Sequence, residues 1–194
     1  MPARVLVLFA HPALQKSRVN RHLATAARQV PGVTFHDLYE VYPDFQIDVP
    51  REQEQLLAHD VIVFQHPFYW YSAPALLKEW LDLVLEYGFA YGPTGTRLQG
   101  KSLLSAITTG GSAHAYTREG HNHFTMRELL APFEQTARLC GMTWLDPFVI
   151  HHASRLGEAT SLSPHIARYT QVLANLRDGQ PAPASVTPPS IAKP

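Results

Sequence analysis

Hydrophobic positions along the chain alternate between short continuous runs and longer amphipathic stretches. The run Val5-Leu6-Val7-Leu8-Phe9-Ala10 and the run Val61-Ile62-Val63-Phe64 contain no polar residue. Short runs of this kind are typical of strands buried on both faces, as in a parallel sheet. Between such runs, apolar residues recur every three or four positions, which indicates amphipathic helices. The pattern therefore predicts a regular alternation of strand and helix.

The alternation predicts five strands and five main helices. We expect strands at about residues 4–10, 33–38, 61–65, 102–108 and 143–151, and helices at about 17–30, 50–58, 75–87, 125–140 and 158–177. Thr125-Met126-Arg127-Glu128 has the capping-box pattern that opens a helix, and Pro132 should kink that helix. Residues 39–45, punctuated by Pro43, are expected to form a loop.

Five strand-helix units without an internal repeat predict the fold class. We expect an α/β protein with a flavodoxin-like, doubly wound, five-stranded parallel sheet in the order 2-1-3-4-5. Residues 1–178 should form this single domain. Residues 179–194 contain several prolines and no periodic pattern, and are expected to form a mobile tail.

Composition narrows the class of protein. The 194 residues are 45% hydrophobic and carry a formal net charge of zero, which argues against a nucleic-acid partner or a polybasic membrane anchor. A single cysteine excludes a disulfide framework and favours a reducing cytoplasm. The first apolar run is too short for a signal peptide, and no run approaches eighteen apolar residues. We expect a cytoplasmic protein.

The predicted strand order places three loops around one crevice, at the carboxyl ends of strands one, three and four. In the first loop, His11 follows strand one, and a helix start follows at Ser17, Arg18, Val19 and Asn20. Free N–H groups and the positive end of the helix dipole favour a phosphate at such a position. The alternative is a simple serine cap with a surface histidine, because no phosphate-binding glycine motif is present.

The second loop is rich in aromatic residues. It follows strand three and consists of Pro67, Phe68, Tyr69, Trp70 and Tyr71. Aromatic side chains at this edge of a sheet suggest a platform for a flat ring such as a flavin. The alternative is ordinary packing beneath a loop.

The third loop follows strand four and consists of Thr108, Thr109, Gly110 and Gly111. The two glycines allow the backbone to approach a ligand closely, so that their N–H groups can face the O2 and N1 edge of a flavin. The alternative is a glycine turn. The convergence of three such loops favours a bound flavin, and a single phosphate seat favours FMN over FAD.

The motifs in these loops resemble those of a known family. They are Ala10-His11-Pro12, Tyr42-Pro43-Asp44-Phe45, Gln65-His66-Pro67 with Trp70-Tyr71-Ser72, and Thr108-Thr109-Gly110-Gly111. The chain resembles the flavodoxin-fold NAD(P)H:quinone oxidoreductases, and among them the ancillary proteins of glutathione-regulated potassium efflux systems.

The resemblance implies a function. It implies hydride transfer from NADH or NADPH through the flavin to a quinone, in a homodimer with the flavin near the interface. The alternative is a regulatory ancillary subunit of a potassium efflux system, with incidental oxidoreductase activity, held at the inner membrane by its protein partner. The loop from Tyr39 to Ile47 is a plausible interface segment.

The resemblance also indicates a proton donor. The tyrosine that follows Thr-Thr-Gly-Gly-Ser in the quinone reductases falls on Tyr116, but their histidine six positions later falls on Asn122. His121 and His123 flank that asparagine, so either is a candidate to reprotonate Tyr116. The alternative is that Tyr116 is a packing residue.

The remaining histidines and the cysteine have structural interpretations. His36 and His59 are expected at the surface, His66 as a hydrogen-bonding structural residue, and Cys140 in the core. The pairs formed by His121 with His123 and by His151 with His152 lack the helical i, i+4 spacing of a typical metal pair. We therefore expect no metal site.

Overall fold

The computed structural model describes residues 2–156 and 159–180, with side chains from residue 162 onward in the last helix. The first described element is β1 (Val5–Phe9), which lies in the middle of a parallel sheet. The proline-rich tail predicted for residues 179–194 lies almost entirely outside the described residues.

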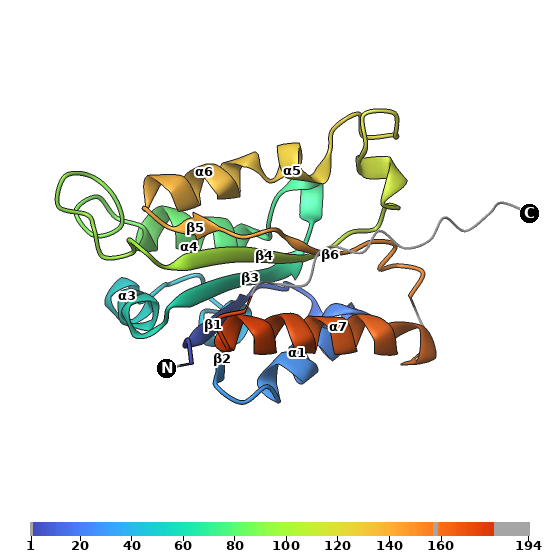
Figure 1. Ribbon diagram of the computed structural model, residues 1–194, viewed down its shortest axis with the longest axis horizontal. Coiled ribbons are helices and arrows are strands. Elements are labelled where there is room, and N and C mark those ends of the chain that lie inside the picture. The colour runs from blue at the N-terminus through green and yellow to red at the C-terminus, as the bar shows by residue number, and fades with distance from the viewer. Residues whose placement is uncertain (1, 157–158, 181–194) are drawn as a thin grey trace, which may run out of the picture.

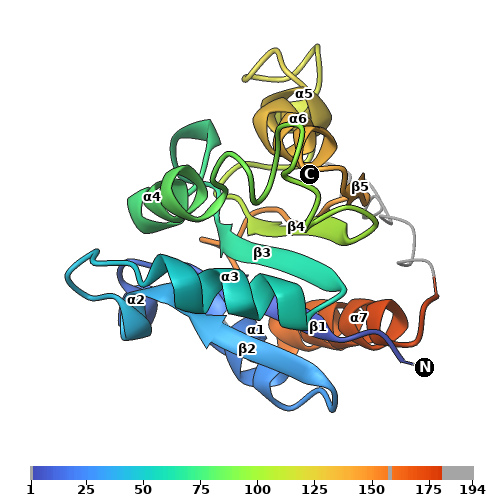
Figure 2. The ribbon, with the colours of Figure 1, turned by 90° about the vertical axis from the view of Figure 1, so that its left-hand side faces the viewer.

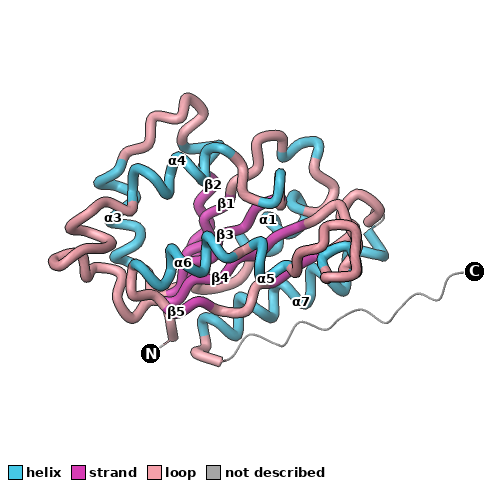
Figure 3. The backbone as a smooth tube through the Cα atoms, turned by 90° about the horizontal axis from the view of Figure 1, so that it is seen from above, coloured by secondary structure: helices cyan, strands magenta, loops and turns pink. Residues whose placement is uncertain are grey.

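Parallel strands build the sheet in the predicted order. The strands are β1, β2 (Val33–Asp37), β3 (Val61–Pro67), β4 (Ser102–Thr108), β5 (Thr143–Trp144) and β6 (Phe148–Ile150). The order is β2-β1-β3-β4-β5 (Figure 3). The remaining strand, β6, also pairs with β4. The doubly wound order 2-1-3-4-5 is confirmed.

Helices cover both faces of the sheet. They are α1 (Asn20–Arg28), α2 (Leu38–Val41), α3 (Val49–Ala58), α4 (Ala75–Val84), α5 (Met126–Leu129), α6 (Ala131–Leu139) and α7 (Ala159–Arg177). Figures 1 and 2 show α1 and α7 on one side of the strands and α4, α5 and α6 on the other. Each face has its own apolar core, one containing Val7, Val63 and Leu173, and the other Phe64 and Trp80.

Strand register places the three predicted loops at one edge. Phe9 pairs with Gln65, and Pro67 pairs with Thr108, so β1, β3 and β4 end close together. Their buried apolar side chains fix this register, because a shift by one residue would turn every side chain to the opposite face. The edge that follows these strands therefore carries the candidate site.

Two elements differ from the predictions. The expected strand over 143–151 is divided into β5 and β6, with Pro147, which has no N–H to donate, in the gap. The expected loop over 39–45 begins with the short helix α2, because Asp37 Oδ1 accepts from the N–H groups of Tyr39, at 3.1 Å, and Glu40, at 3.4 Å.

Helix boundaries follow the predictions within three residues. Helix α1 begins at Asn20, and Ser17 Oγ accepts from its N–H at 3.0 Å, three residues beyond the expected start. Helix α4 ends at Val84, before the expected Tyr87. The capping box at Thr125 is present, and the break between α5 and α6 confirms the effect expected of Pro132.

The prediction that His36 and His59 lie at the surface is wrong. Both are buried; His36 Nε2 lies 2.9 Å from Glu52 Oε1, and His59 Nε2 lies 2.8 Å from Thr34 Oγ1. Their partners are 16 and 25 residues away in sequence, so local pattern does not reveal them. The interpretations of His66 and Cys140 are confirmed: both are buried, and His66 Nδ1 lies 2.9 Å from Pro67 O.

Candidate functional site

The loop after β1 presents hydrogen-bond donors. His11 is 6% exposed, and its Nδ1 accepts from the N–H of Ala13 at 3.1 Å. This bond assigns the ring proton to Nε2, which can then donate to a ligand. Burial lowers the pKa of His11, so the imidazole is neutral at pH 7.

The start of α1 adds further donors. The backbone N–H groups of Arg18 and Val19 form no hydrogen bond with other described residues. Asn20 is buried; its Nδ2 donates to Thr108 Oγ1 at 2.8 Å, while its Oδ1 has no partner among the described residues. A buried amide left half bonded is uncommon in a folded protein unless a ligand or water completes it.

The aromatic loop after β3 holds its side chains in an unusual backbone conformation. Trp70 (φ 50°) and Tyr71 (φ 60°) are left-handed within the turn Tyr69–Tyr71, and the Trp70 side chain is 93% exposed. Bulky residues in this region cost about 1–3 kcal/mol each and cluster at ligand-binding sites. Phe68 is buried beneath them, and its N–H donates to Thr108 O at 2.8 Å.

The loop after β4 exposes its backbone. A Cβ placed on Gly110 would meet no atom beyond its chain neighbours within 4 Å, so the space beside Gly110 is open. Thr109 is held by two bonds: its N–H donates to Ile150 O at 2.9 Å, and its Oγ1 to Gly111 O at 3.0 Å. The backbone of Gly110 is therefore open to a ligand, and the preceding residue, Thr109, is fixed in position.

Contacts between the loops show that the three segments lie together. Asn20 joins the first loop to the third, and Phe68 joins the second to the third. The rings of His11 and Tyr69 join the first to the second, with centroids 6.1 Å apart. Together the loops offer a seat for an anion, an exposed aromatic surface and an open glycine backbone. This set fits a ligand with one phosphate and one flat ring.

Tyr116 lies beside this site, on the short helical turn His114–Tyr116. Its ring lies 6.2 Å from that of Phe68 and 5.5 Å from that of His151. Burial raises the pKa of Tyr116, and the nearby side chain of Thr109 partly offsets that rise. The structure thus brings Tyr116 to the edge of the glycine loop.

The candidate partners His121 and His123 are placed differently. Both are exposed, and neither forms a hydrogen bond or a ring contact with Tyr116 in the part of the chain that the structure describes. Between them, Asn122 Oδ1 accepts from Tyr71 OH at 3.2 Å. The asparagine therefore supports the aromatic loop.

Sequence reasoning missed His151. It follows β6, and its Nδ1 lies 3.1 Å from Thr109 Oγ1. Burial, and secondarily the neighbouring His152, lowers the pKa of His151 to about 4. The available signal was its place directly after a strand, because polar residues at the carboxyl ends of parallel strands gather at the ligand edge.

The described residues also form a groove that lies apart from this site. This groove, of about 400 Å³ between α3 and the loop after α4, is bordered by Leu57, Phe89 and Arg97. In Figure 1, α3 lies toward the ends of the strands opposite the candidate site. Within residues 2–156 and 159–180, no group of three or more His, Cys, Asp or Glu residues is placed to hold a metal ion. None of the described helices has the length and apolarity needed to cross a membrane.

Comparison with known proteins gives close relatives. The family described as having a flavodoxin-like fold matches residues 3–173. The glutathione-regulated potassium-efflux system ancillary protein KefG of Escherichia coli is 53% identical over 174 residues, covering 90% of this chain and 94% of that protein.

Two solved structures are similar to this chain in sequence and in fold. General stress protein 14 of Treponema denticola, in complex with FMN, is 39% identical and has a TM-score of 0.80, covering 89% of this chain and 97% of that one. An NADPH-quinone reductase from P. pentosaceus is 34% identical and has a TM-score of 0.78, covering 87% of this chain and 96% of that one.

Proposed function

This chain belongs to the family of proteins with a flavodoxin-like fold, and from that premise we propose that it is an FMN-dependent NAD(P)H:quinone oxidoreductase. The observation that carries the proposal is Asn20 at the start of α1, a buried amide whose Oδ1 has no partner among residues 2–156 and 159–180. The FMN complex and the quinone reductase among the similar structures support the choice of cofactor and acceptor.

The phosphate of FMN would bind at the start of α1. His11 Nε2 and the N–H groups of Arg18 and Val19 are donors, and the helix dipole favours an anion there. The Asn20 amide can rotate so that Oδ1 accepts from the Thr108 hydroxyl and Nδ2 faces the phosphate. One such seat favours FMN over FAD.

The ring of the flavin would lie between the aromatic loop and the glycine loop. Phe68 to Tyr71 supply an aromatic surface for the ring. The N–H groups of Gly110 and Gly111, which donate to no other described residue, would donate to the ring edge. When bound, the flavin accepts a hydride from NADH or NADPH and supplies two electrons to a quinone. Tyr116 donates a proton to the quinone oxygen as negative charge develops on it.

Flavin binding tests this proposal directly. We expect the purified chain to retain FMN, and Asn20→Ala to weaken FMN binding by about 1–3 kcal/mol, or roughly 5- to 150-fold in Kd. Fluorescence quenching measures the affinity. Thr25→Ala, which removes an exposed hydroxyl of the same helix, is the matched control. A wild-type chain that remains colourless after reconstitution with FMN or FAD would overturn the proposal.

We also propose that the active form is a homodimer. Trp70, Tyr71 and Phe45 are 93%, 48% and 40% exposed, so one chain leaves a large aromatic surface in water. A second copy, contacting the loop from Tyr39 to Ile47, would cover it. Sedimentation velocity at micromolar concentration checks this proposal, and a monomer with full turnover would contradict it.

The second candidate function is regulatory. The relative at 53% identity is named as an ancillary protein of a potassium-efflux system, which favours a cytoplasmic chain that docks on a membrane protein. In that case the oxidoreductase activity is incidental. Copurification with a potassium efflux protein, retained in a variant that no longer binds FMN, would favour the regulatory function over catalysis.

A further inference from the structure

We propose that Asn122 is a positioning residue for the flavin ring, because it holds the side chain of Tyr71 in place. The hydroxyl of Tyr71 donates to Asn122 Oδ1 at 3.2 Å. This inference rests on the proposed function, in which Tyr71 belongs to the aromatic surface for the ring. Asn122 would act through Tyr71, so it is not a catalytic residue.

The two left-handed aromatic residues of the loop after β3 differ in how their side chains are held. Trp70 is 93% exposed, and its side chain forms no hydrogen bond or ring contact with another described residue. The ring of Tyr71 lies edge-on to that of Phe68, with centroids 6.4 Å apart and an interplanar angle of 87°, and its hydroxyl bonds to Asn122. A bulky left-handed residue is strained and persists where surrounding contacts hold it. Tyr71 is therefore the fixed ring of this pair.

Backbone bonds fix the turn that carries Tyr71. The N–H of Phe68 donates to Thr108 O at 2.8 Å, and the N–H of Ser72 donates to Tyr69 O at 3.0 Å. These bonds set the backbone on both sides of Tyr71, but they leave its side chain free to rotate. The contact with Phe68 and the hydrogen bond to the asparagine amide set the direction of the ring.

Asn122 is presented from a tightly folded segment, residues 112–124, which we call the 112–124 loop. The N–H of Asn122 donates to Ala115 O at 3.0 Å. A Cβ on Gly120 would lie 1.9 Å from His114 O, so the loop folds back on itself more closely than a side chain at that position would allow. The amide of Asn122 therefore projects from a defined backbone.

Contacts with two other segments hold the 112–124 loop. The N–H of His152 donates to Gly111 O at 3.0 Å, which attaches the start of the loop to the segment after β6. Within the loop, Arg118 pairs with Glu128, the glutamate of the capping box that opens α5. The loop is therefore a fixed support for the aromatic loop beside it.

The same loop carries the proposed proton donor. The ring of Tyr116 lies 6.2 Å from that of Phe68, which also lies beside Tyr71. Asn122 bonds to Tyr71 through its side chain and to the residue before Tyr116 through its backbone. The aromatic surface and the proton donor therefore pack as one group. The side-chain amide does not titrate, so the contribution of Asn122 to this group is geometric.

A double-mutant cycle in the unfolding equilibrium tests the contact without flavin. The full chain, purified without flavin, is compared with Tyr71→Phe, Asn122→Ala and the double variant by urea denaturation. Each single change removes the same bond, so the double variant should have an unfolding constant about two- to tenfold smaller than additivity predicts. Additive effects would overturn the contact, whatever the fate of the proposed function.

The affinity for FMN tests the positioning role. Asn122→Ala should weaken FMN binding about two- to tenfold, measured by fluorescence quenching, and should have less than about a twofold effect in Tyr71→Phe protein. Asn122→Asp keeps an acceptor oxygen at the same place and should restore the affinity. The aspartate change in Tyr71→Phe protein measures the effect of the added charge alone. Glu119→Ala, at an exposed position in the same loop, is the matched control and should change the affinity less than about twofold.

The outcomes separate this inference from the proposed function. Wild-type FMN affinity in Asn122→Ala would overturn the positioning role and leave the flavin site intact. Equal losses from Asn122→Ala with and without the Tyr71 hydroxyl would overturn it as well, because the amide would then act by another route. A wild-type protein that binds no flavin would instead remove the proposed function, and the unfolding cycle would still show whether Asn122 holds Tyr71.

Discussion

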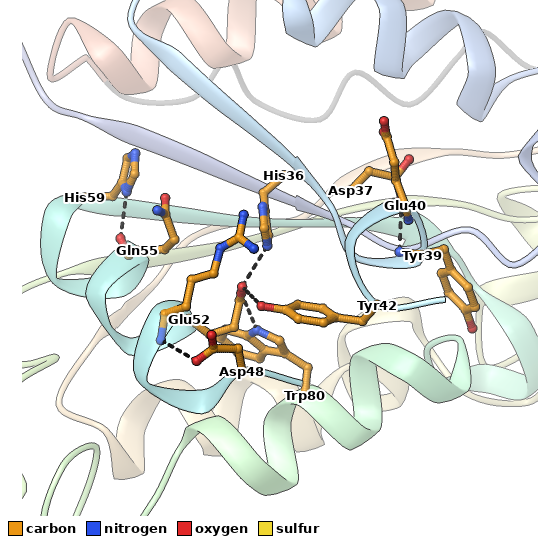
Figure 4. A network of polar contacts seen from close by, with 11 residues as sticks. His36, Asp37, Tyr39, Glu40, Tyr42, Asp48, Glu52, Gln55, His59 and Trp80 are labelled. Carbon is orange, nitrogen blue, oxygen red and sulfur yellow. Dashed lines mark hydrogen bonds and ion pairs between the residues drawn. The ribbon is translucent and has the colours of Figure 1, made fainter. Parts of the chain in front are cut away.

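Two buried polar clusters of this protein differ in how completely their hydrogen bonds are satisfied. In the first, the fully buried carboxylate of Glu52 accepts from Tyr42 OH at 2.6 Å, Trp80 Nε1 at 2.8 Å and His36 Nε2 at 2.9 Å (Figure 4). In the second, at the start of α1, Asn20 bonds to Thr108 through Nδ2, and its Oδ1 has no partner in the part of the chain that the structure describes.

The difference indicates that the Glu52 cluster stabilises the fold and that the Asn20 cluster is arranged to bind a ligand. The donors to Glu52 come from β2, from the residue after α2 and from α4, so the carboxylate joins three segments on one side of the sheet. The loops around Asn20 contain left-handed aromatic residues, an exposed tryptophan and open backbone at Gly110. These features lower the stability of the folded protein when no ligand is bound. Changes in the first cluster should therefore affect folding, and changes in the second should affect binding.

The largest effect is expected from Glu52→Ala. This change leaves three buried donors without their acceptor, which should lower the free energy of unfolding by about 3–5 kcal/mol. Glu54→Ala on the same helix, at an exposed position, should change it by less than about 0.5 kcal/mol. Urea denaturation followed by circular dichroism measures both. Equal stabilities for the two variants would mean that the Glu52 cluster does not stabilise the fold.

The pH dependence of the free energy of unfolding tests the role of the Glu52 cluster. Burial alone would raise the pKa of Glu52, but the hydrogen bonds from His36, Tyr42 and Trp80 outweigh it, and the pKa is lowered from 4.5. A carboxylate with a lowered pKa in the folded state stabilises it fully above the unfolded value. That contribution is lost as the pH falls from about 4.5 through the lower folded value.

The measurement is the free energy of unfolding between pH 7 and pH 3. The loss of stability in wild type below pH 4.5 should exceed that in Glu52→Gln. Asp60 also titrates in acid, since Arg4 lowers its pKa to about 2, but it contributes to both proteins and cancels in the difference. Parallel curves for the two proteins would contradict the lowered pKa of Glu52.

A smaller effect than that of Glu52→Ala, with the opposite sign, is expected from Trp70→Gly. Trp70 is left-handed and almost fully exposed, so glycine relieves backbone strain and removes little packing. We expect a gain of up to about 1 kcal/mol in the free energy of unfolding, together with weaker FMN binding. A loss of stability would show that the ring is packed in solution, as it would be in a homodimer.

Local sequence signals predicted most of the architecture. The apolar runs of β1 and β3 identified buried parallel strands, and the capping box at Thr125 and the break at Pro132 were found where expected. These signals are local because an apolar run, a cap or a proline acts on the backbone within a few residues. The loops that follow three of the strands could be assigned to one edge because the carboxyl ends of parallel strands lie at the same edge of a sheet.

What the sequence determined by itself is the order of strands and the set of loops at their carboxyl ends, since both follow from hydrophobic periodicity and from the handedness of strand-helix-strand connections. Only the tertiary structure decided which polar groups meet. Glu52 and Trp80, or Thr109 and His151, are 28 and 42 residues apart, and their burial and pairing depend on how the sheet brings distant segments together. No local pattern carries that information, because the free energy of a buried polar group is set by its neighbours in space.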